Sequence, residues 1–332
     1  MTSEPQGADE FETIARLLRP LAGAPEALGL MDDAAVIPSR PGQDLIVSKD
    51  AMVAGVHFLD ADPLDLVARK LLRTNLSDLA AKGAEPYGYF LAIAWPAGAG
   101  WAERERFAAG LAEDQACFGV TLLGGDTVST PGPLTLSLTI LGWTPSGAMV
   151  RRAAARAGDR VLVSGTIGDG WLGLKAAQGE LSGVVTPDAA EWLAGRYRLP
   201  EPRLELRDVL RARAGGAADV SDGLIADAGH IAEASGVHLR LELGRLPVSE
   251  PAAQWLDRQP ERAQALMALA AGGDDYEIIL TAQPAHVGAL IAEAEAAGVA
   301  LTEIGDAVEG EGVKVAFEGR EVEVGRGGWR HG

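Results

Sequence analysis

Six short clusters of aspartate with glycine, serine or asparagine contain the residues in this sequence best suited to chemistry. They are GLMDD at 29–33, SKD at 48–50, NLSD at 75–78, GGDT at 124–127, DVSDG at 219–223 and GGDD at 272–275. Each cluster taken alone is typical of a turn, because aspartate and glycine favour turn conformations. Several of them, however, follow a predicted strand or begin a predicted helix, where α/β proteins place ligand groups. Carboxylates in such places are suited to magnesium, which prefers carboxylate and phosphate oxygens.

Asp78 differs from the others because it lies within a predicted amphipathic helix, beside the apolar stripe. A carboxylate at the edge of a buried face needs a partner, and a metal ion is one. Magnesium ions held by spread carboxylates would let ATP approach a second phosphate, since phosphoryl transfer is mostly positioning and charge neutralisation. The sequence has neither a GxxxxGK[ST] phosphate loop nor the protein-kinase motifs. A phosphotransferase with this sequence must belong to another class.

The elements that would position these clusters alternate between strands and helices. In the first half we predict strands at 44–50, which would end at Asp50, and at 89–94, 121–123 and 134–141, with helices at 63–81 and 101–117. In the second half we predict strands at 161–163 and 276–281, a helix from Asp169 or Gly170, a helix capped by Ser221, a helix at 284–297 and a closing hairpin at 313–324. The segment 165–170 mimics a dinucleotide fingerprint, but a glycine turn that opens a helix is the commoner explanation.

Composition narrows the class of protein. The chain has 332 residues, of which 47% are hydrophobic and 23% charged, so two soluble domains are expected. A glycine-containing, basic segment at 144–160 places the boundary, giving domains at 1–145 and 146–332. The net charge of −18 argues against nucleic acid as a partner. The polar N-terminus and the lack of a long apolar run predict a cytoplasmic protein with no membrane partner. The single cysteine, Cys117, is expected to be a buried, inert thiol.

In this order and spacing, the clusters resemble the thiamine-monophosphate kinase family, in the superfamily that includes aminoimidazole ribonucleotide synthetase. The stretches that carry the resemblance are DDAA at 32–35, VAGVHF at 53–58, NLSDLAA at 75–81, GGDT at 124–127, VSDGL at 220–224, GGDDYE at 272–277 and GW at 328–329. They span nearly the whole chain.

The resemblance implies a fold and a reaction. The expected fold is mixed α/β with two domains: an N-terminal domain for ATP, magnesium and dimerisation, which forms a β-barrel across a homodimer, and a C-terminal α/β sandwich. The active site would lie in the cleft between them. The expected reaction uses ATP to convert thiamine monophosphate to thiamine diphosphate. The expected cofactors are several Mg²⁺ ions, and a monovalent cation is allowed.

The resemblance also implies roles for individual residues. The magnesium positions are Asp33, Ser48, Asp50, Asp78, Asp126, Asp219 and Asp222. The positions around ATP are Gly125, Asp126, Arg152 and Ser221, and those for the thiamine moiety are His57, Asp274 and Trp329. Asp50, Asp126 and Arg152 are the expected catalytic residues. Asp32 and Asp275 have no assigned role, and we expect a structural one.

Simpler explanations remain beside these roles. Arg152 is also explained as a solvated linker arginine, Trp329 as a residue that closes a hydrophobic seam, and His57 as a satisfied structural histidine. The sequence also departs from the family at Met31, where glycine is usual, and at Lys49, where threonine is usual and acts as a metal ligand. We hypothesise that the Lys49 ammonium replaces part of one magnesium charge or reaches the phosphates. The alternatives are another ATP-dependent enzyme of the superfamily and a catalytically inactive nucleotide-binding relative.

Overall fold

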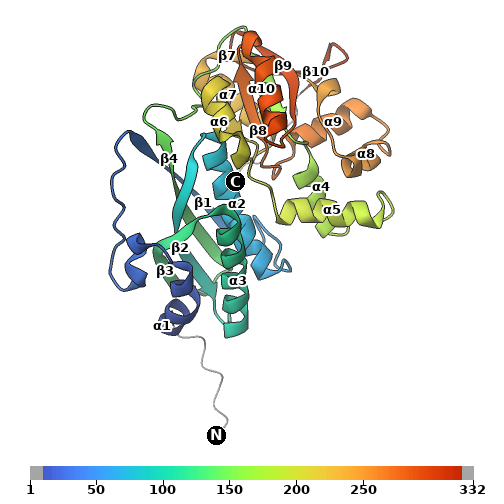
Figure 1. Ribbon diagram of the computed structural model, residues 1–332. Helices are drawn as coiled ribbons and strands as arrows, with labels where there is room; N and C mark the ends of the chain where they lie inside the picture. The colour runs from blue at the N-terminus through green and yellow to red at the C-terminus, as the bar shows by residue number, and fades with distance from the viewer. Residues whose placement is uncertain (1–9, 324–332) are drawn as a thin grey trace. The chain divides into compact units, whose positions relative to one another are not determined.

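The chain forms two compact units (Figure 1). The computed structural model describes residues 10–323. The first unit contains the described chain up to Leu79 and the segment Ala84–Gly147, and the second contains Ala80–Gly83 and the described chain from Ala148 onward. Within the described range, no helix is both long and apolar enough to span a bilayer.

A four-stranded sheet forms the centre of the first unit. Its strands are β1 (Gln43–Val53), β2 (Glu85–Pro96), β3 (Thr121–Thr130) and β4 (Thr135–Pro145), in the order β1-β4-β2-β3. The pairing of β2 with β3 is parallel, and the other two pairings are antiparallel. The long helices are α2 (Leu64–Ala81) and α3 (Trp101–Phe118), and a short α1 (Glu10–Thr13) precedes a π-helical turn.

The two faces of this sheet differ in burial. On β1, Ile46 and Met52 are buried, whereas Leu45 and Val47 on the alternate positions are 38% and 56% exposed. Because successive strand residues point to opposite faces, one face packs into the core and the other is open. The apolar stripe of α2, including Leu71, is fully buried.

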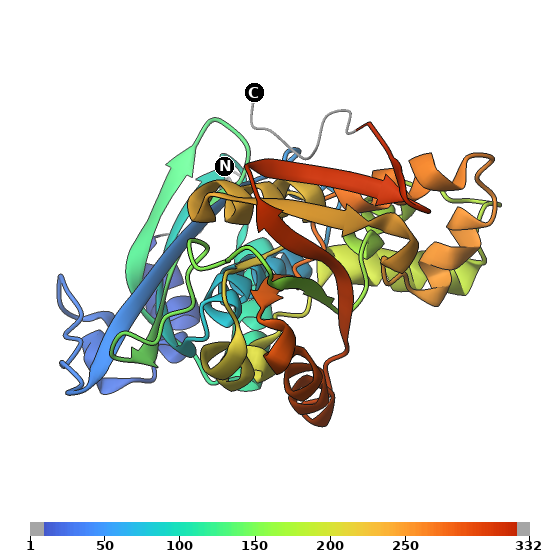
Figure 2. The same ribbon diagram turned by 90° about the horizontal axis from the view of Figure 1, so that it is seen from above.

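A seven-stranded sheet forms the centre of the second unit, in the order β11-β10-β7-β9-β5-β8-β6. The strands are β5 (Arg160–Ser164), β6 (Ala217–Asp219), β7 (Val237–Glu242), β8 (Ile278–Ala282), β9 (Leu301–Glu309), β10 (Gly312–Phe317) and β11 (Arg320–Glu321). Only β7 and β10, side by side in Figure 2, pair in parallel among the described strands of this sheet. The antiparallel pairing of β10 with β11 confirms the predicted closing hairpin.

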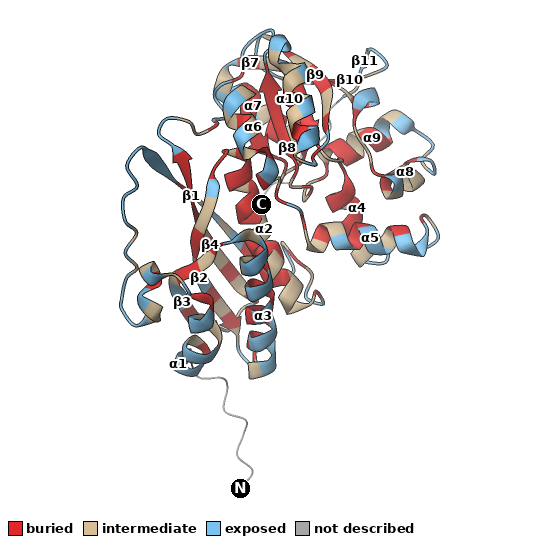
Figure 3. Cartoon of the chain, viewed as in Figure 1, coloured by how far each residue is buried: buried red, intermediate tan, exposed pale blue. Residues whose placement is uncertain are grey.

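Seven α-helices of the described chain belong to the second unit. They are α4 (Asp169–Ala177), α5 (Pro187–Arg198), α6 (Arg207–Arg213), α7 (Leu224–Ser235), α8 (Glu250–Leu256), α9 (Arg262–Ala271) and α10 (Pro284–Ala296). The central strands are buried (Figure 3), and residues such as Val161, Leu172 and Ile231 form one continuous apolar core with them. Gly168 is the N-cap of α4 and has a φ of 95°, which confirms the glycine turn that opens this helix.

Four sequence predictions about local structure are wrong. The strand predicted at 121–123 continues as β3 to Thr130, so Asp126 lies within the strand and not after it. Strand β1 does not end at Asp50, because its ladder with β4 continues to the pair Val53–Thr135. Ser221 does not cap α7, since that helix begins at Leu224 after Gly223 and has no side-chain cap. Cys117 is exposed, because α3 turns a different face, which includes the buried Asp114, toward the core.

Candidate active site

Strand β1 and helix α2 bring three of the predicted magnesium residues together. Ser48 and Asp50 alternate with Ile46 and Met52, so they lie on the core-facing side of β1. The Ser48 hydroxyl donates a hydrogen bond of 2.5 Å to Oδ2 of Asp78 on α2. The Asp50 backbone N–H donates at 3.2 Å to Oδ1 of Asn75, which lies about one helical turn before Asp78 on α2. The result is a half-buried group of oxygen atoms anchored by a strand and a helix.

Lys49 is on the other face of β1. It is exposed and pairs with Thr139 of β4, whereas its neighbours Ser48 and Asp50 are half-buried on the core side. The side chain of Lys49 therefore starts on the face opposite to the Ser48–Asp78 hydrogen bond. Met31, the other departure from the family pattern, is 74% exposed.

A second group of predicted residues lines a cavity of about 510 Å³ in the first unit. Asp32, Asp33, Gly125 and Asp126 all contribute to its wall. Gly125 has a φ of 156°, and a Cβ atom built on it would lie 1.8 Å from the carbonyl oxygen of Leu91. Only glycine fits there, because β3 runs too close to β2 for any side chain.

The sheet register separates the first group from Asp126. Asp126 pairs with Ala92 of β2, which pairs with Ser137 of β4, which in turn pairs with Ala51 of β1. Paired residues share a face, so this row belongs to the open face, as the exposure of Ala92 and Ala51 also indicates. The Ser48–Asp78 group therefore lies on one face of the sheet and Asp126 on the other.

His57 has a fixed ring orientation. The Val53 backbone N–H donates to Nδ1 of His57 at 3.1 Å, and Lys70 Nζ donates to the His57 carbonyl oxygen at 3.3 Å. Since Nδ1 accepts a hydrogen bond, the proton of the neutral ring is on Nε2. This contact agrees with the structural explanation for His57.

In the second unit, two predicted clusters run side by side. The Asp274 N–H donates to the Ser221 carbonyl oxygen at 2.9 Å, and the Tyr276 N–H donates to that of Val220 at 2.8 Å. Asp274 has a φ of 68°, a conformation that aspartate tolerates better than most residues. These bonds place the predicted substrate residue Asp274 beside residues 219–223, whose members Asp219 and Asp222 are predicted magnesium residues.

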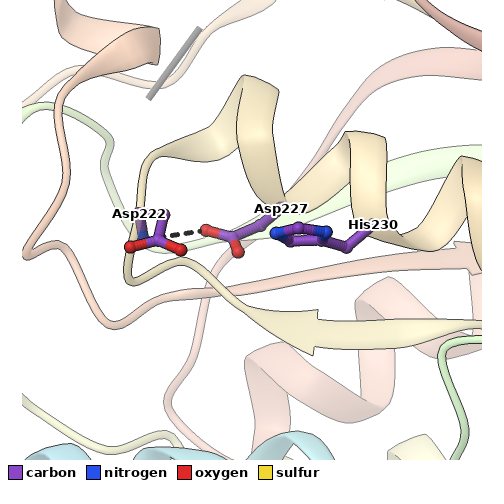
Figure 4. A group of neighbouring side chains, drawn as sticks. All are labelled: Asp222, Asp227 and His230. Carbon is purple, nitrogen blue, oxygen red and sulfur yellow. Dashed lines mark hydrogen bonds between the residues drawn. The ribbon is translucent and has the colours of Figure 1, made fainter. Parts of the chain in front are cut away.

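Asp227, on the first turns of α7, organises the same segment and was not predicted from the sequence. Its Oδ2 atom accepts the backbone N–H groups of Ser221 at 3.0 Å and Asp222 at 3.1 Å. Burial and the charge of Asp222 raise the pKa of Asp227 to about 7, while these hydrogen bonds and the charge of Arg152 oppose the rise. Asp222, Asp227 and His230 carry ligand atoms within 4.8 Å of one another (Figure 4). The sequence offered one indication of this role, which is that Asp227 is a charged residue among the apolar residues of a predicted helix.

Arg152 is held through its backbone. Its carbonyl oxygen accepts the Ser235 hydroxyl at the last residue of α7, at 2.8 Å, while its side chain is exposed. The positive charge of Arg152 acts to lower the pKa of Asp227, the residue that accepts the Ser221 and Asp222 amides. The backbone of Arg152, predicted as an ATP and catalytic residue, is therefore fixed by the last residue of α7.

Buried hydrogen bonds and ion pairs hold the 272–277 segment in place. Asp275 accepts the N–H groups of Gly168 and Gly170 at 2.8 and 2.9 Å, and burial raises its pKa well above the usual value. Glu277 accepts Nε of Arg203 at 2.7 Å and the Ser164 hydroxyl at 2.7 Å. These contacts give Asp275 the structural role expected of it. Trp329, predicted to bind the thiamine moiety, lies outside the described residues.

Comparison with known families sets the class of the protein. The N-terminal domain model of the AIR synthase related proteins matches residues 31–144, and the C-terminal domain model matches residues 156–318. These two matches fall in the two halves of the chain, and each half carries candidate residues. The fold class is therefore the mixed α/β, two-domain fold of the AIR synthase related proteins.

Individual relatives narrow that class. A thiamine-monophosphate kinase of Caulobacter vibrioides is 60% identical over 97% of this chain and 91% of its own length. The crystal structure of the thiamine-monophosphate kinase of Stenotrophomonas maltophilia is 37% identical, with a TM-score of 0.80 over 92% of this chain and 94% of that one. A structure described as AaThiL complexed with AMPPCP and TMP is 28% identical, with a TM-score of 0.76 over 95% of this chain and 98% of that one. This chain belongs to the thiamine-monophosphate kinase family.

Proposed function

We propose that this chain transfers the γ-phosphoryl group of ATP to thiamine monophosphate in the cytoplasm, giving thiamine diphosphate and ADP. The observation that carries the proposal is the likeness, over 95% of this chain, to a structure complexed with AMPPCP and TMP. A kinase that is 60% identical over nearly the whole chain supports the same reaction. The candidate residues of both units have side chains suited to phosphates and cations rather than to an apolar ligand.

The donor atoms of the first unit fit magnesium. Ser48, Asp50 and Asp78 offer hydroxyl and carboxylate oxygens, and the 2.5 Å Ser48–Asp78 hydrogen bond shows that two of these side chains converge. Magnesium prefers such oxygen ligands and keeps several waters. We propose that these residues, with Asp33, Asp126, Asp219 and Asp222, hold Mg²⁺ ions. Bound Mg²⁺ would neutralise the negative charge of the phosphates.

The residues of the chain then have separate tasks. The attacking atom is a phosphate-monoester oxygen, which is mostly ionised at neutral pH because its second pKa is about 6, so no dedicated base is needed. This oxygen bonds to the γ-phosphorus as the bond to the β,γ-bridging oxygen breaks, and ADP leaves with that electron pair. Arg152 steadies the transferring charge, as arginine does in related chemistry. Gly125 and Ser221 contact ATP, while His57, Asp274 and Trp329 bind thiamine monophosphate.

We further propose that the protein is a homodimer whose N-terminal sheets form a β-barrel. The open face of the sheet in one chain exposes Leu45, Val47 and Val128, and a second copy would cover them. Domain 1–145 would then serve ATP, magnesium and dimerisation, and domain 146–332 would complete the site as an α/β sandwich. Lys49 shares the open face, so its ammonium would be enclosed in the barrel, where it could contribute charge to the phosphates.

The test is a direct assay of the purified protein with ATP, MgCl₂ and thiamine monophosphate. We expect thiamine diphosphate and ADP in equal amounts by liquid chromatography. Asp50→Asn should abolish turnover, whereas Asp188→Asn, the same change at an exposed position of α5, should leave it unchanged. A wild-type protein that binds AMPPCP but forms no thiamine diphosphate would instead be the inactive nucleotide-binding relative.

A further inference from the structure

Residues 219–223 contain three residues with proposed ligand roles, and the four residues after Asp219 form a loop without regular structure between β6 and α7. Strand β6 ends at Asp219, and α7 begins at Leu224. Gly223 has a φ of 116°, so the chain turns sharply there. Side-chain ligands on such a turn are precise only if other groups fix its backbone.

Asp227 is the group that fixes it. Its carboxylate is buried, with 1% of the residue exposed, and one oxygen accepts the N–H groups of both Ser221 and Asp222. A single acceptor that binds two successive amides sets the orientation of the peptide planes between them. The ligand atoms of Asp222 and Asp227 also lie within 4.8 Å of each other, so the two side chains share one space (Figure 4).

Helix α7 holds Asp227 firmly in place. Its neighbours Leu224, Ala228 and Ile231 belong to the core of the second unit, and the Asp227 N–H donates to the Gly223 carbonyl oxygen at 3.0 Å. At the other end of the same helix, the Ser235 hydroxyl holds the Arg152 carbonyl oxygen. One rigid helix thus fixes two separate segments that carry proposed nucleotide residues.

We infer that Asp227 is a positioning residue for nucleotide and magnesium binding, acting through the backbone amides of Ser221 and Asp222. This inference rests on the proposed function for the identity of the ligands. Asp227 acts without contacting ATP itself. Its effect is to hold Ser221 and Asp222 in the conformation in which their side chains meet the ligand.

The experiment measures equilibrium binding of AMPPCP to the full chain by calorimetry over a series of MgCl₂ concentrations. Asp227→Ala should weaken AMPPCP binding and raise the half-saturating Mg²⁺ concentration by roughly 10- to 100-fold, the usual effect of losing a residue that orients a ligand. Asp227→Asn should bind within about threefold of wild type, because its carboxamide oxygen can accept both amides. Amide hydrogen exchange of residues 219–223 should rise in Asp227→Ala alone.

The matched control is Asp159→Ala. Asp159 is also buried in the second unit and also accepts a backbone N–H, that of Arg156 at 2.9 Å, but it does not contact residues 219–223 through a described hydrogen bond. It should lose stability without any change in the Mg²⁺ dependence. If Asp227→Ala does not fold, Asp227→Ser takes its place with the same expectation, because the shorter hydroxyl cannot serve both amides.

Three results would overturn the inference. They are unchanged AMPPCP and Mg²⁺ dependence in Asp227→Ala, an equal shift in Asp159→Ala, and equal damage in Asp227→Asn and Asp227→Ala. Binding of AMPPCP needs neither thiamine monophosphate nor turnover. A wild-type protein that binds AMPPCP without making thiamine diphosphate would therefore contradict the proposed function and leave the inference about Asp227 open to the same measurement.

Discussion

Glu277 offers a sharp test of how the second unit is stabilised. Its side chain has no exposed surface, and it accepts both Nε and Nη2 of Arg203, at 2.7 and 2.5 Å, and Nη2 of Arg196 at 3.2 Å. Burial lowers the pKa of Arg203, but the hydrogen bond and charge of Glu277 more than compensate and raise it. Glu277→Gln keeps the shape of the side chain and removes the charge that both arginines face.

The expected cost follows from the two arginines left behind. Removing one partner of a buried ion pair typically costs about 3–5 kcal/mol. Arg196 and Arg203 are partly exposed, and each keeps a second partner in the exposed Glu201, at 3.7 Å from Arg196 and 3.2 Å from Arg203. The lower end of that range therefore applies. About 3 kcal/mol corresponds to a fall of roughly 6–12 °C in the midpoint of thermal unfolding for a domain of this size.

Differential scanning calorimetry of the wild type and Glu277→Gln would measure this fall. The control is Glu293→Gln, because Glu293 also binds an arginine, Arg213, through two nitrogens, but 43% of the Glu293 side chain and 29% of the Arg213 side chain are exposed to solvent. Exposed pairs contribute little, so the control should unfold at nearly the wild-type temperature. Equal midpoints for the two variants would refute the assignment of stability to burial of the Glu277 cluster.

Three further results are expected. Gly125→Ala, whose Cβ would lie 1.8 Å from the Leu91 carbonyl oxygen, should weaken AMPPCP binding by at least about tenfold, whereas Gly195→Ala, with open space around its Cβ, should not. Burial raises the pKa of Asp169 above 3.8, although its hydrogen bonds with Ser249 and Thr166 oppose the rise. Because the folded-state pKa is raised, the protonated carboxyl contributes to the stability of the folded state at low pH. This contribution is lost as the pH rises through the folded-state pKa. In denaturation series from pH 4 to 8, Asp169→Asn should therefore lose less stability than wild type with rising pH. Cys117 should react with a thiol reagent without denaturant, one equivalent per chain.

The sequence predicted the long elements well, because their periodicity is strong. Helices α2 and α3 and strand β4 agree with prediction within a few residues. The end of β1 was wrong for a physical reason: an aspartate looks like a strand terminator, but Asp50 stays in the ladder because its side chain faces the partly solvated Ser48–Asp78 group. Tertiary contacts there override the local preference of the residue.

The candidate residues were identified by type and order, but their grouping needed the structure. No sequence pattern shows that Asp126 and Asp50 lie on opposite faces of one sheet, because this depends on the register of three pairings among four strands. Asp227 was missed because its role is a contact to backbone amides five and six residues earlier, which leaves no motif. The prediction that Cys117 is buried was wrong because the buried face of α3 includes a charged residue. Asp114 lies on that face, paired with two arginines, whereas the apolar pattern predicted that Cys117 would lie there.

The four residues Ala80–Gly83 have a consequence for dissecting the protein into fragments. They comprise the last two residues of α2 and the two that follow it, yet they belong to the second unit. There Lys82 Nζ donates to the Ala217 carbonyl oxygen at 2.8 Å, and the Val150 N–H donates to the Lys82 carbonyl oxygen at 3.1 Å. The chain therefore passes between the units three times. A fragment cut after Gly147 would take Lys82 away from strand β6, which leads directly to Asp219. We expect that neither half can be expressed as a faithful copy of its unit, and that a circular permutant would preserve both units better than any truncation.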